Sequence, residues 1–252
     1  MSDKHPPATV RWVDRTDSTF SMISADSPHG FCVAAHTQTS GRGQRGNSWE
    51  AAPGVNLTFS MCLRPRTITP ARQYELSMLV STAVCDYLRQ FVPEPDQLLL
   101  KWPNDIYYQD LKMGGILIEQ TLSGHKIERS VAGIGINVNQ TEFVSNAPNP
   151  VSLKQLTGLS YDLEEMMQQL ADAIVERFDA YEASPDQMTL LVDYRTRLWR
   201  AAGFHPYRER TSGRRFMGAI TAIDPSGPVT ITEPDGHAHT FAFKEVEALL
   251  GE

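Results

Sequence analysis

Residues 101–119, KWPNDIYYQDLKMGGILIE, constrain the fold of this chain more than any other stretch of it. A proline turn and an Asn-Asp pair follow Lys101, and the β-type apolar runs at 98–108 and 113–122 predict a hairpin. Lys101 and Lys112 bring two cations to this hairpin, and Gly114 and Gly115 leave part of its backbone without side chains. A ligand could lie flat against these glycines while the hairpin holds a carboxylate and a phosphate together.

Two further segments have the composition of a phosphate site. TSGRGQRGNSW at 39–49 interleaves glycines with Arg42 and Arg45, so that backbone N–H groups can approach an anion and guanidinium groups can bind phosphate. The closing Gly-Lys-Ser/Thr of a Walker loop is missing, and the strand that follows excludes a dinucleotide fingerprint. GIGINVN at 133–139 is the other segment. Each one alone also fits a surface loop or a strand end, but together they indicate a nucleotide-using site.

The hydrophobic pattern predicts a mixture of strands and helices. Apolar β-type runs predict strands at 9–15, 31–37, 56–63 and 130–138, and a hairpin from 98–108 and 113–122. Apolar faces with helical spacing predict helices at 70–91, 163–181 and 186–199. Thr16 or Asp17 is expected to cap a short helix that has Ser18 and Thr19 in its first turn.

Strands predominate after Gly203, with turns at Ser212-Gly213, Pro225–Gly227 and Asp235-Gly236. We therefore expect two domains, residues 1–202 and 203–252. The first lacks a strict β-α-β alternation, which favours an α+β fold, a mixed sheet with helices on one face. The second is expected to be a small β-barrel that packs on the first, since so short a segment buries little core by itself.

Charge and cysteine content exclude several functional classes. The 252 residues carry a formal net charge of −7, which argues against a protein that mainly coats nucleic acid. Cys32, Cys62 and Cys85 are widely spaced and flanked by apolar residues, so we expect buried free thiols and no disulfide or metal site. The N-terminus lacks an apolar signal core and no segment is long enough to span a membrane, so a cytoplasmic location is expected.

The order and spacing of the motifs resemble one family closely, the biotin protein ligases. The matching elements are DST at 17–19, Gln38 with the GRG…RG…W loop to Trp49, KWPND at 101–105, K-x-G-G-I-L-I-E at 112–119, and G-I-G-I-N at 133–137. The resemblance implies a class II synthetase-like α+β catalytic domain followed by an SH3-like β-barrel. It also implies a two-step reaction: biotin and Mg-ATP give biotinyl-5′-AMP, and a lysine of a biotin carboxyl carrier protein then displaces AMP.

The resemblance also assigns roles to residues of this chain. It implies that Lys112, with Arg45, Lys101 and Asp105, carries the catalytic charge, Lys112 lying where the biotin carboxylate meets the α-phosphate. Biotin is expected to contact Ser18, Thr19, Gln38, Gly41, Arg42, Gly115, Gly133 and Gly135. ATP and the adenylate are expected to contact Arg42, Gly43, Gln44, Arg45, Trp49, Asn104 and Asn137. Asp105 is the expected magnesium ligand, with Asn137 beside it.

Two departures from the family pattern concern affinity and regulation. Gln44 and Asn47 stand where the family loop usually has arginines, so we expect either weaker retention of the adenylate or compensation by Arg42 and Arg45. The first motif begins at Asp17, which leaves no room for the DNA-binding domain of the repressor members. The chain is therefore expected to be of the short type that does not bind DNA. A homodimer is a further expectation from the family.

Two alternative functions remain open from the sequence. A lipoate or octanoate ligase shares the fold and the adenylation chemistry, although KWPND with the GRG loop favours biotin. A non-catalytic biotin sensor is the other alternative, but the presence of Lys101, Asp105 and Lys112 argues against an inactive enzyme.

Overall fold

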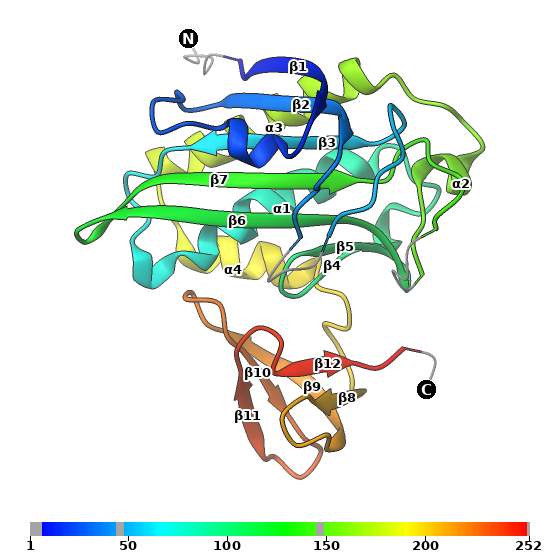
Figure 1. The fold of residues 1–252 in the computed structure, drawn as a ribbon. Coiled ribbons are helices and arrows are strands. Elements are labelled where there is room, and N and C mark those ends of the chain that lie inside the picture. The colour runs from blue at the N-terminus through cyan, green and yellow to red at the C-terminus, as the bar shows by residue number, and fades with distance from the viewer. Residues whose placement is uncertain (1–6, 44–47, 145–148, 251–252) are drawn as a thin grey trace.

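A seven-stranded mixed sheet forms the larger part of the molecule, as the computed structural model shows for residues 7–43, 48–144 and 149–250 (Figure 1). The strand order is β1-β2-β3-β7-β6-β5-β4. β1 and β2 run parallel, and the other neighbouring pairs are antiparallel. The strands are β1 (Thr9–Thr16), β2 (Phe31–Gln38), β3 (Leu57–Leu63), β4 (Leu98–Lys101), β5 (Asp105–Tyr108), β6 (Leu111–Ser123) and β7 (Lys126–Ile136).

Three long helices cover one face of this sheet: α1 (Tyr74–Arg89), α3 (Leu163–Ala183) and α4 (Gln187–Thr196) (Figure 1). The side chain of Asp162 accepts hydrogen bonds from the backbone of Glu164 and Glu165 and so begins α3. Single 3₁₀ turns lie at η1 (Thr19–Met22), η3 (Pro70–Arg72) and η4 (Pro95–Gln97). The predicted α+β fold, with a mixed sheet and helices on one face, is confirmed.

The core lies between the sheet and these helices. Along β3, the fully buried Leu57, Phe59 and Met61 belong to the core that α1 and α3 share, whereas the alternate residues point to the opposite face. On that opposite face a smaller apolar cluster surrounds Phe20 of η1 and Cys62. The open face is therefore left for the site.

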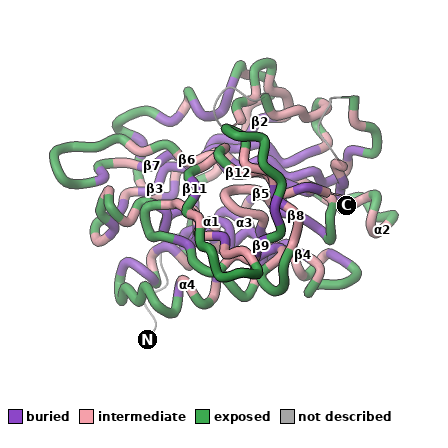
Figure 2. Tube along the Cα trace, turned by 90° about the horizontal axis from the view of Figure 1, so that it is seen from below, coloured by how far each residue is buried: buried purple, intermediate pink, exposed green. Residues whose placement is uncertain are grey.

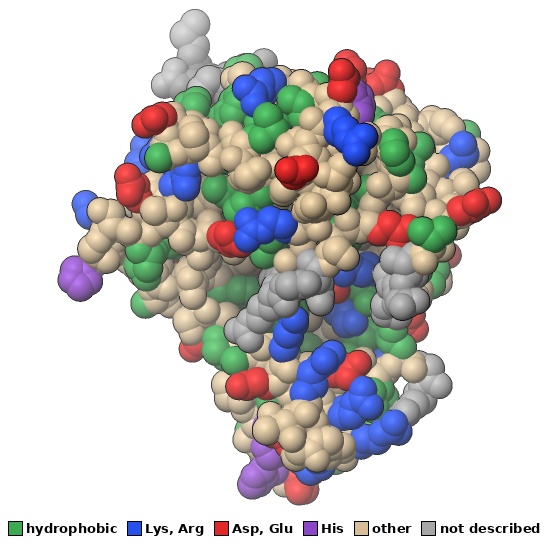
Figure 3. All heavy atoms as spheres, in the orientation of Figure 1, with side chains coloured by type: hydrophobic (Ala, Val, Ile, Leu, Met, Phe, Trp, Pro, Cys, Tyr) green, Lys and Arg blue, Asp and Glu red, His purple; other side chains and the backbone are tan. Residues whose placement is uncertain are grey.

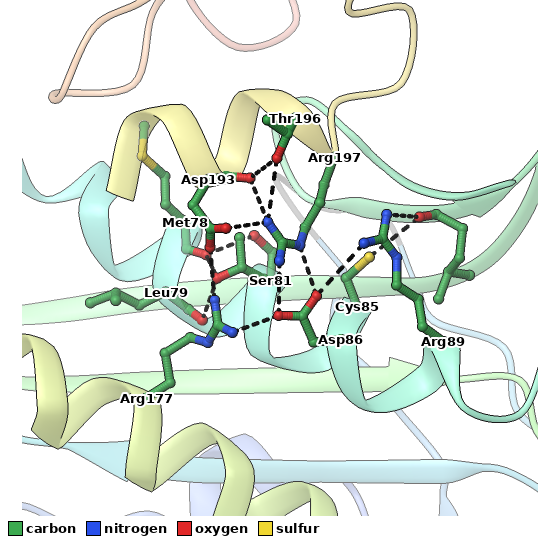
Figure 4. A network of polar contacts seen from close by, with 12 residues as sticks. Met78, Leu79, Ser81, Cys85, Asp86, Arg89, Arg177, Asp193, Thr196 and Arg197 are labelled. Carbon is green, nitrogen blue, oxygen red and sulfur yellow. Dashed lines mark hydrogen bonds and ion pairs between the residues drawn. The ribbon is translucent and has the colours of Figure 1, made fainter. Parts of the chain in front are cut away.

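A network of charged side chains fastens the three helices together (Figure 4). Arg177 of α3 pairs with Asp86 of α1 at 2.5 Å and with Asp193 of α4 at 3.0 Å. Arg197 binds the same two carboxylates, at 2.8 Å to Asp86, while its carbonyl accepts a hydrogen bond from Leu100 in β4. Because both arginines share both acids, the network fixes the helices relative to the edge of the sheet.

The C-terminal part is a five-stranded antiparallel sheet in the order β11-β10-β9-β8-β12. Its strands are β8 (His205–Glu209), β9 (Arg215–Ile223), β10 (Val229–Thr232), β11 (Ala238–Phe241) and β12 (Val246–Ala248). Seen from below, these strands are far more exposed than those of the large sheet (Figure 2). We call this part the barrel. The domain boundary at 202/203 stays a prediction.

Several element boundaries differ from those that the sequence predicts. Ser18, not Thr16 or Asp17, precedes η1, because Thr16 still pairs with Gln38 in the sheet. The last long helix ends at Thr196, since Leu198 and Trp199 run beside Leu100 of β4. The sequence reading missed β12 and the short helix α2 (Leu153–Thr157), which a capping box of Ser152 and Gln155 begins.

The three cysteines are buried and free, as predicted. Burial raises the pKa of the Cys85 thiol to about 11 and raises the pKa values of Cys32 and Cys62 as well. Among the residues that the structure describes, no helix has the length and apolar character needed to span a membrane. The cytoplasmic location stays a prediction.

Candidate active site

A cleft of about 960 Å³ lies between the open face of the large sheet and the barrel. Lys and Arg side chains gather along this hollow on the face shown in Figure 3. Most of the site residues predicted from the sequence line this cleft: Ser18, Thr19, Gln38, Arg42, Gly43, Trp49, Lys101, Asn104, Asp105, Lys112, Gly115, Gly133, Gly135 and Asn137. Gln44 and Arg45 lie outside the described residues. The fold therefore brings segments 19 to 137 to one place.

One end of the cleft carries uncharged hydrogen-bonding groups. The Thr19 amide donates to the Gln38 side-chain oxygen at 2.8 Å, and the Thr19 and Ser60 hydroxyls lie 2.8 Å apart. Thr19 and Ser60 are both buried, and Ser18 precedes them at the start of η1. Small hydroxyl and amide groups of this kind can pair with the polar atoms of a neutral ligand without placing a charge in the interior.

The floor of the cleft is formed by the glycines of β6 and β7. Along β7, Ile134 and Ile136 point into the helical core, and Gly133 and Gly135 alternate with them on the open face. A β-carbon at Gly135 would lie 2.3 Å from Cε2 of Trp49, and one at Gly133 would lie 3.1 Å from the Phe20 ring. Aromatic rings thus lie directly on the backbone here, which only glycine permits.

Trp49 covers this floor. Its ring also lies 3.5 Å from the β-carbon position of Gly115, and its buried Nε1 has no hydrogen-bond partner among the residues that the structure describes. Gly41 is not among the cleft-lining residues, and its role is different. A β-carbon on Gly41 would lie 2.7 Å from the Trp49 carbonyl oxygen, so a glycine lets the two backbone segments of the loop approach each other.

Lys112 and Asp105 form an ion pair in the middle of the cleft. Their Nζ and Oδ1 atoms are 2.7 Å apart, and both side chains are partly exposed. The β5–β6 pairing sets this geometry, since Asp105 lies opposite Gly115 and a bulge after Ile106 then places Tyr107 opposite Lys112. The contact with Asp105 holds the Lys112 side chain beside the glycine floor, where its Cε lies 3.8 Å from the β-carbon position of Gly115.

Asn137 holds the backbone of Lys112 in place. Its buried amide nitrogen donates to the carbonyls of Val151, at 3.2 Å, and Lys112, at 3.4 Å. The Lys112 carbonyl also accepts a hydrogen bond from the amide of Val151. The amide nitrogen of Asn137 is thus used within the protein, so any contact with a ligand or a metal would be made through its oxygen.

Lys101 lies in a pocket of aromatic rings at the barrel side of the cleft. Its Nζ donates to the Tyr107 hydroxyl at 2.9 Å and lies 4.5 Å and 5.2 Å from the ring centroids of Tyr107 and Trp199. Burial lowers the pKa of Lys101 from its ordinary value, and nearby Asp105 opposes that shift. The rings stabilise a cation that has lost part of its hydration.

Arg42 and Asn104 also line the cleft. The exposed Arg42 pairs with Glu119 at 2.8 Å and stacks over Phe20, with its Cζ 4.9 Å from the ring centroid. The Asn104 side chain donates to the Ile116 carbonyl at 2.8 Å and so ties the 101–105 turn to β6. Both residues therefore have structural partners in addition to lining the cleft.

Sequence reasoning missed four residues of the site: Phe20, Ser60, Tyr107 and Trp199. Ser60 carried a signal, because it is a polar residue in an otherwise apolar strand and faces the side away from the core. Trp199 carried none, since its contact with Lys101 depends on how the chain runs beside β4. Among the described residues there is no group of three His, Cys, Asp or Glu side chains that could hold a metal ion by themselves.

The arrangement fits one kind of chemistry. A neutral polar end, a flat glycine floor, and two lysines beside one carboxylate can bring a carboxylate and a phosphate together and offset their repulsion. Bringing two bound substrates together in this way does not require a covalent enzyme intermediate.

Comparison with known proteins agrees with this arrangement. Residues 12–137 match the biotin/lipoate A/B protein ligase family. The chain is 31% identical to the biotin–[acetyl-CoA-carboxylase] ligase of Paracoccus denitrificans over 88% of its own length and 93% of that protein. It is 28% identical to the bifunctional ligase/repressor BirA of Escherichia coli, covering 62% of that longer protein. A solved structure of the Aquifex aeolicus biotin protein ligase with biotin and ATP superposes with a TM-score of 0.77, at 23% identity over 96% of this chain and 99% of that one.

Proposed function

The chain belongs to the biotin/lipoate A/B protein ligase family, and we propose that it is an ATP-dependent biotin protein ligase. It joins biotin to AMP and then transfers the biotinyl group to a lysine of a biotin carboxyl carrier protein. The observation that carries this proposal is the order of groups along the sheet: β6, which bears Lys112, lies between β3, which bears Ser60, and β4, which bears Lys101.

In the first step a carboxylate oxygen of biotin attacks the α-phosphorus of ATP, and pyrophosphate leaves. Thr19, Gln38 and Ser60 bind the uncharged ring end of biotin, where each polar atom needs a partner. The carboxylate then reaches Lys112, whose charge offsets the two anions that must approach each other. Lys101 adds a second positive charge on the side of the leaving phosphates.

Asp105 is the carboxylate that fits a magnesium ion in this site. A single acid suits magnesium, which usually keeps several waters and is bound through one or two carboxylates together with substrate phosphates. The ion would supply charge neutralisation at the phosphates. Asp105 would exchange its contact with Lys112 for the ion and leave the lysine ammonium available to the biotin carboxylate.

In the second step the uncharged amine of the carrier lysine attacks the carbonyl carbon of biotinyl-AMP, and AMP leaves. The glycine floor lets the adenylate lie close to the backbone of β6 and β7, where water is excluded and the anhydride is protected from hydrolysis. Trp49, which covers this floor, must move off it or stack on the bound adenylate.

The partner of this reaction is a biotin carboxyl carrier protein, as for biotin protein ligases generally. The absence of DNA binding and the formation of a homodimer stay predictions.

Pyrophosphate–ATP exchange tests the proposed function. Labelled pyrophosphate should enter ATP when magnesium and biotin are present, and Lys112→Ala should abolish the exchange. Lipoate and octanoate should not support it. Exchange with either of these acids and not with biotin would instead identify a ligase of the lipoate type, and the absence of exchange with every acid would support a binding protein without catalysis.

A further inference from the structure

Trp102 and Pro103 lie inside the KWPND motif, yet the chemistry described above uses neither side chain. The Trp102 indole Nε1–H, directed at the barrel, donates to the carbonyl of Gly227 at 3.0 Å. Gly227 belongs to the turn 224–228 between β9 and β10, which we call the barrel turn. The Trp102 ring also meets the Phe243 ring edge to face, at a centroid distance of 6.5 Å.

Tyr74, at the start of α1, forms hydrogen bonds with both the barrel turn and the KWPND turn. Its backbone amide donates to Pro225 in the barrel turn at 3.0 Å, and its hydroxyl donates to the Pro103 carbonyl at 2.8 Å. The hydroxyl of Tyr194 in α4 lies 2.9 Å from the same Tyr74 oxygen, and both rings are buried. The barrel turn, the KWPND turn and the helical core are therefore connected by direct hydrogen bonds.

The backbone of the barrel turn is shaped for this contact. Gly227 has a φ of +126°, a conformation that residues with a side chain rarely adopt, and a β-carbon there would lie 3.6 Å from the Tyr74 ring. Glycine at this position thus lets the carbonyl point at Trp102 while the turn rests against Tyr74.

The KWPND turn that Trp102 occupies also carries the charged groups of the cleft. Lys101 and Asp105 pair across the turn, and the amide of Asn104 closes it by donating to the Lys101 carbonyl at 3.1 Å. A displacement of Trp102 would therefore move Asp105 relative to Lys112 on β6. Their ion pair, at 2.7 Å, depends on that register.

We propose that Trp102 is a positioning residue through which the barrel turn holds Lys101 and Asp105 in register with Lys112. The barrel then contributes to the reaction without contacting the biotinyl group, because it fixes the turn that bears the charges. This inference rests on the proposed biotin ligase function, since its kinetic effect is read from that reaction.

The test compares Trp102→Phe, Gly227→Ala and the double variant in the full-length chain. Trp102→Phe keeps a ring but loses the N–H donor, and Gly227→Ala disturbs the carbonyl that accepts it. Each single change is expected to lower kcat/KM for ATP about five- to tenfold, the effect of one hydrogen bond, with KM for biotin unchanged. The kcat/KM of the double variant for ATP should be no lower than that of the less active single variant, because both changes break the same hydrogen bond.

Hydrogen exchange of the peptide that covers 98–108 gives a readout that does not depend on activity. Faster exchange of this turn in Trp102→Phe, with no change in the sheet strands β2 and β3, is expected. Trp12→Phe removes an indole that stacks on His36 and does not line the cleft, and it is the matched control that should change neither quantity.

Three outcomes would overturn the inference: unchanged exchange in the turn, equal losses for ATP and biotin, or additive losses in the double variant. Biotin-dependent pyrophosphate exchange by the unaltered protein is measured first. If that activity is absent, the proposed function fails, whereas its presence with an unaffected Trp102→Phe variant refutes only the role of Trp102.

Discussion

The two faces of β7 have opposite requirements within a single strand. Ile134 and Ile136 point to the helices and belong to the main core, and Gly133 and Gly135 lie between them on the open face, under Phe20 and Trp49. The helical face is stabilised by filling space with branched side chains. The open face can receive a ligand because its glycines leave space above the backbone. A substitution should therefore affect either stability or activity according to the face it lies on.

Lys112→Ala is expected to have the largest effect and to act on activity alone. Biotin-dependent pyrophosphate exchange should fall by about 100- to 1,000-fold, since one preorganised charge at the reacting groups is lost. Urea unfolding should change by less than about 1 kcal/mol, because the partly exposed pair with Asp105 contributes little to stability. A loss of stability as large as the loss of activity would show that the two faces are not separable.

Ile136→Ala is the counterpart on the helical face. Ile136 is fully buried in the main core, so truncation should lower the free energy of unfolding by about 2–5 kcal/mol. At a temperature where the variant is folded, KM for biotin and for ATP should stay within about twofold of the original values, because this side chain does not line the cleft. Denaturant melts and initial-rate kinetics on one preparation measure both quantities.

Gly135→Ala sharpens the comparison within the open face. The new methyl would lie 2.3 Å from Cε2 of Trp49, so either the indole moves or the floor is blocked. Overpacking of this kind costs about 1–3 kcal/mol, which predicts a rise of about tenfold or more in KM for biotin. Gly133→Ala, where the methyl would lie 3.1 Å from Phe20, should have a smaller effect. Equal effects of the two changes would contradict a floor centred on Gly135.

Lys101→Met gives the smallest expected effect, and it depends on pH. Burial lowers the pKa of Lys101, so the folded chain holds this proton less strongly than the unfolded chain does. The resulting destabilisation is fully present below the folded pKa and disappears as the pH rises toward the ordinary value of 10.5. The original protein should therefore gain stability relative to Lys101→Met as the pH rises from neutral toward 10.5, which parallel urea melts of both proteins would detect. A difference that stays constant over that range would contradict the shift.

The sequence predicted the features that depend on local pattern. The strands β3 and β7, the apolar faces of α1 and α3, and the lysines and glycines around KWPND all follow from residue order. Contacts between residues far apart in the chain could not be predicted from the local sequence pattern. Trp199 meets Lys101 only because Arg197 is fixed by Asp86 and Asp193, which ends α4 early and turns the chain along β4. In the same way, the indole of Trp102 finds an acceptor more than a hundred residues away.

Local signals were also overlooked in two places. Ser152 and Gln155, followed by Gly158, form a capping box and a left-handed C-cap, which together mark α2. Thr16 has the chemistry of a cap, but its backbone is already committed to pairing with Gln38. Helix ends are therefore decided by competition between local capping and pairing in the sheet, and the second depends on the whole fold.

The burial of all three thiols has a practical consequence. Cys32, Cys62 and Cys85 are enclosed and their pKa values are raised, so the thiolate that reacts with maleimides is scarce at neutral pH. A single cysteine introduced at an exposed position, such as Ser226 in the barrel turn, could then carry a dye without removal of the native ones. The native chain therefore needs no cysteine removal before site-specific labelling, and a dye at this position can report changes in the surroundings of the barrel turn during turnover.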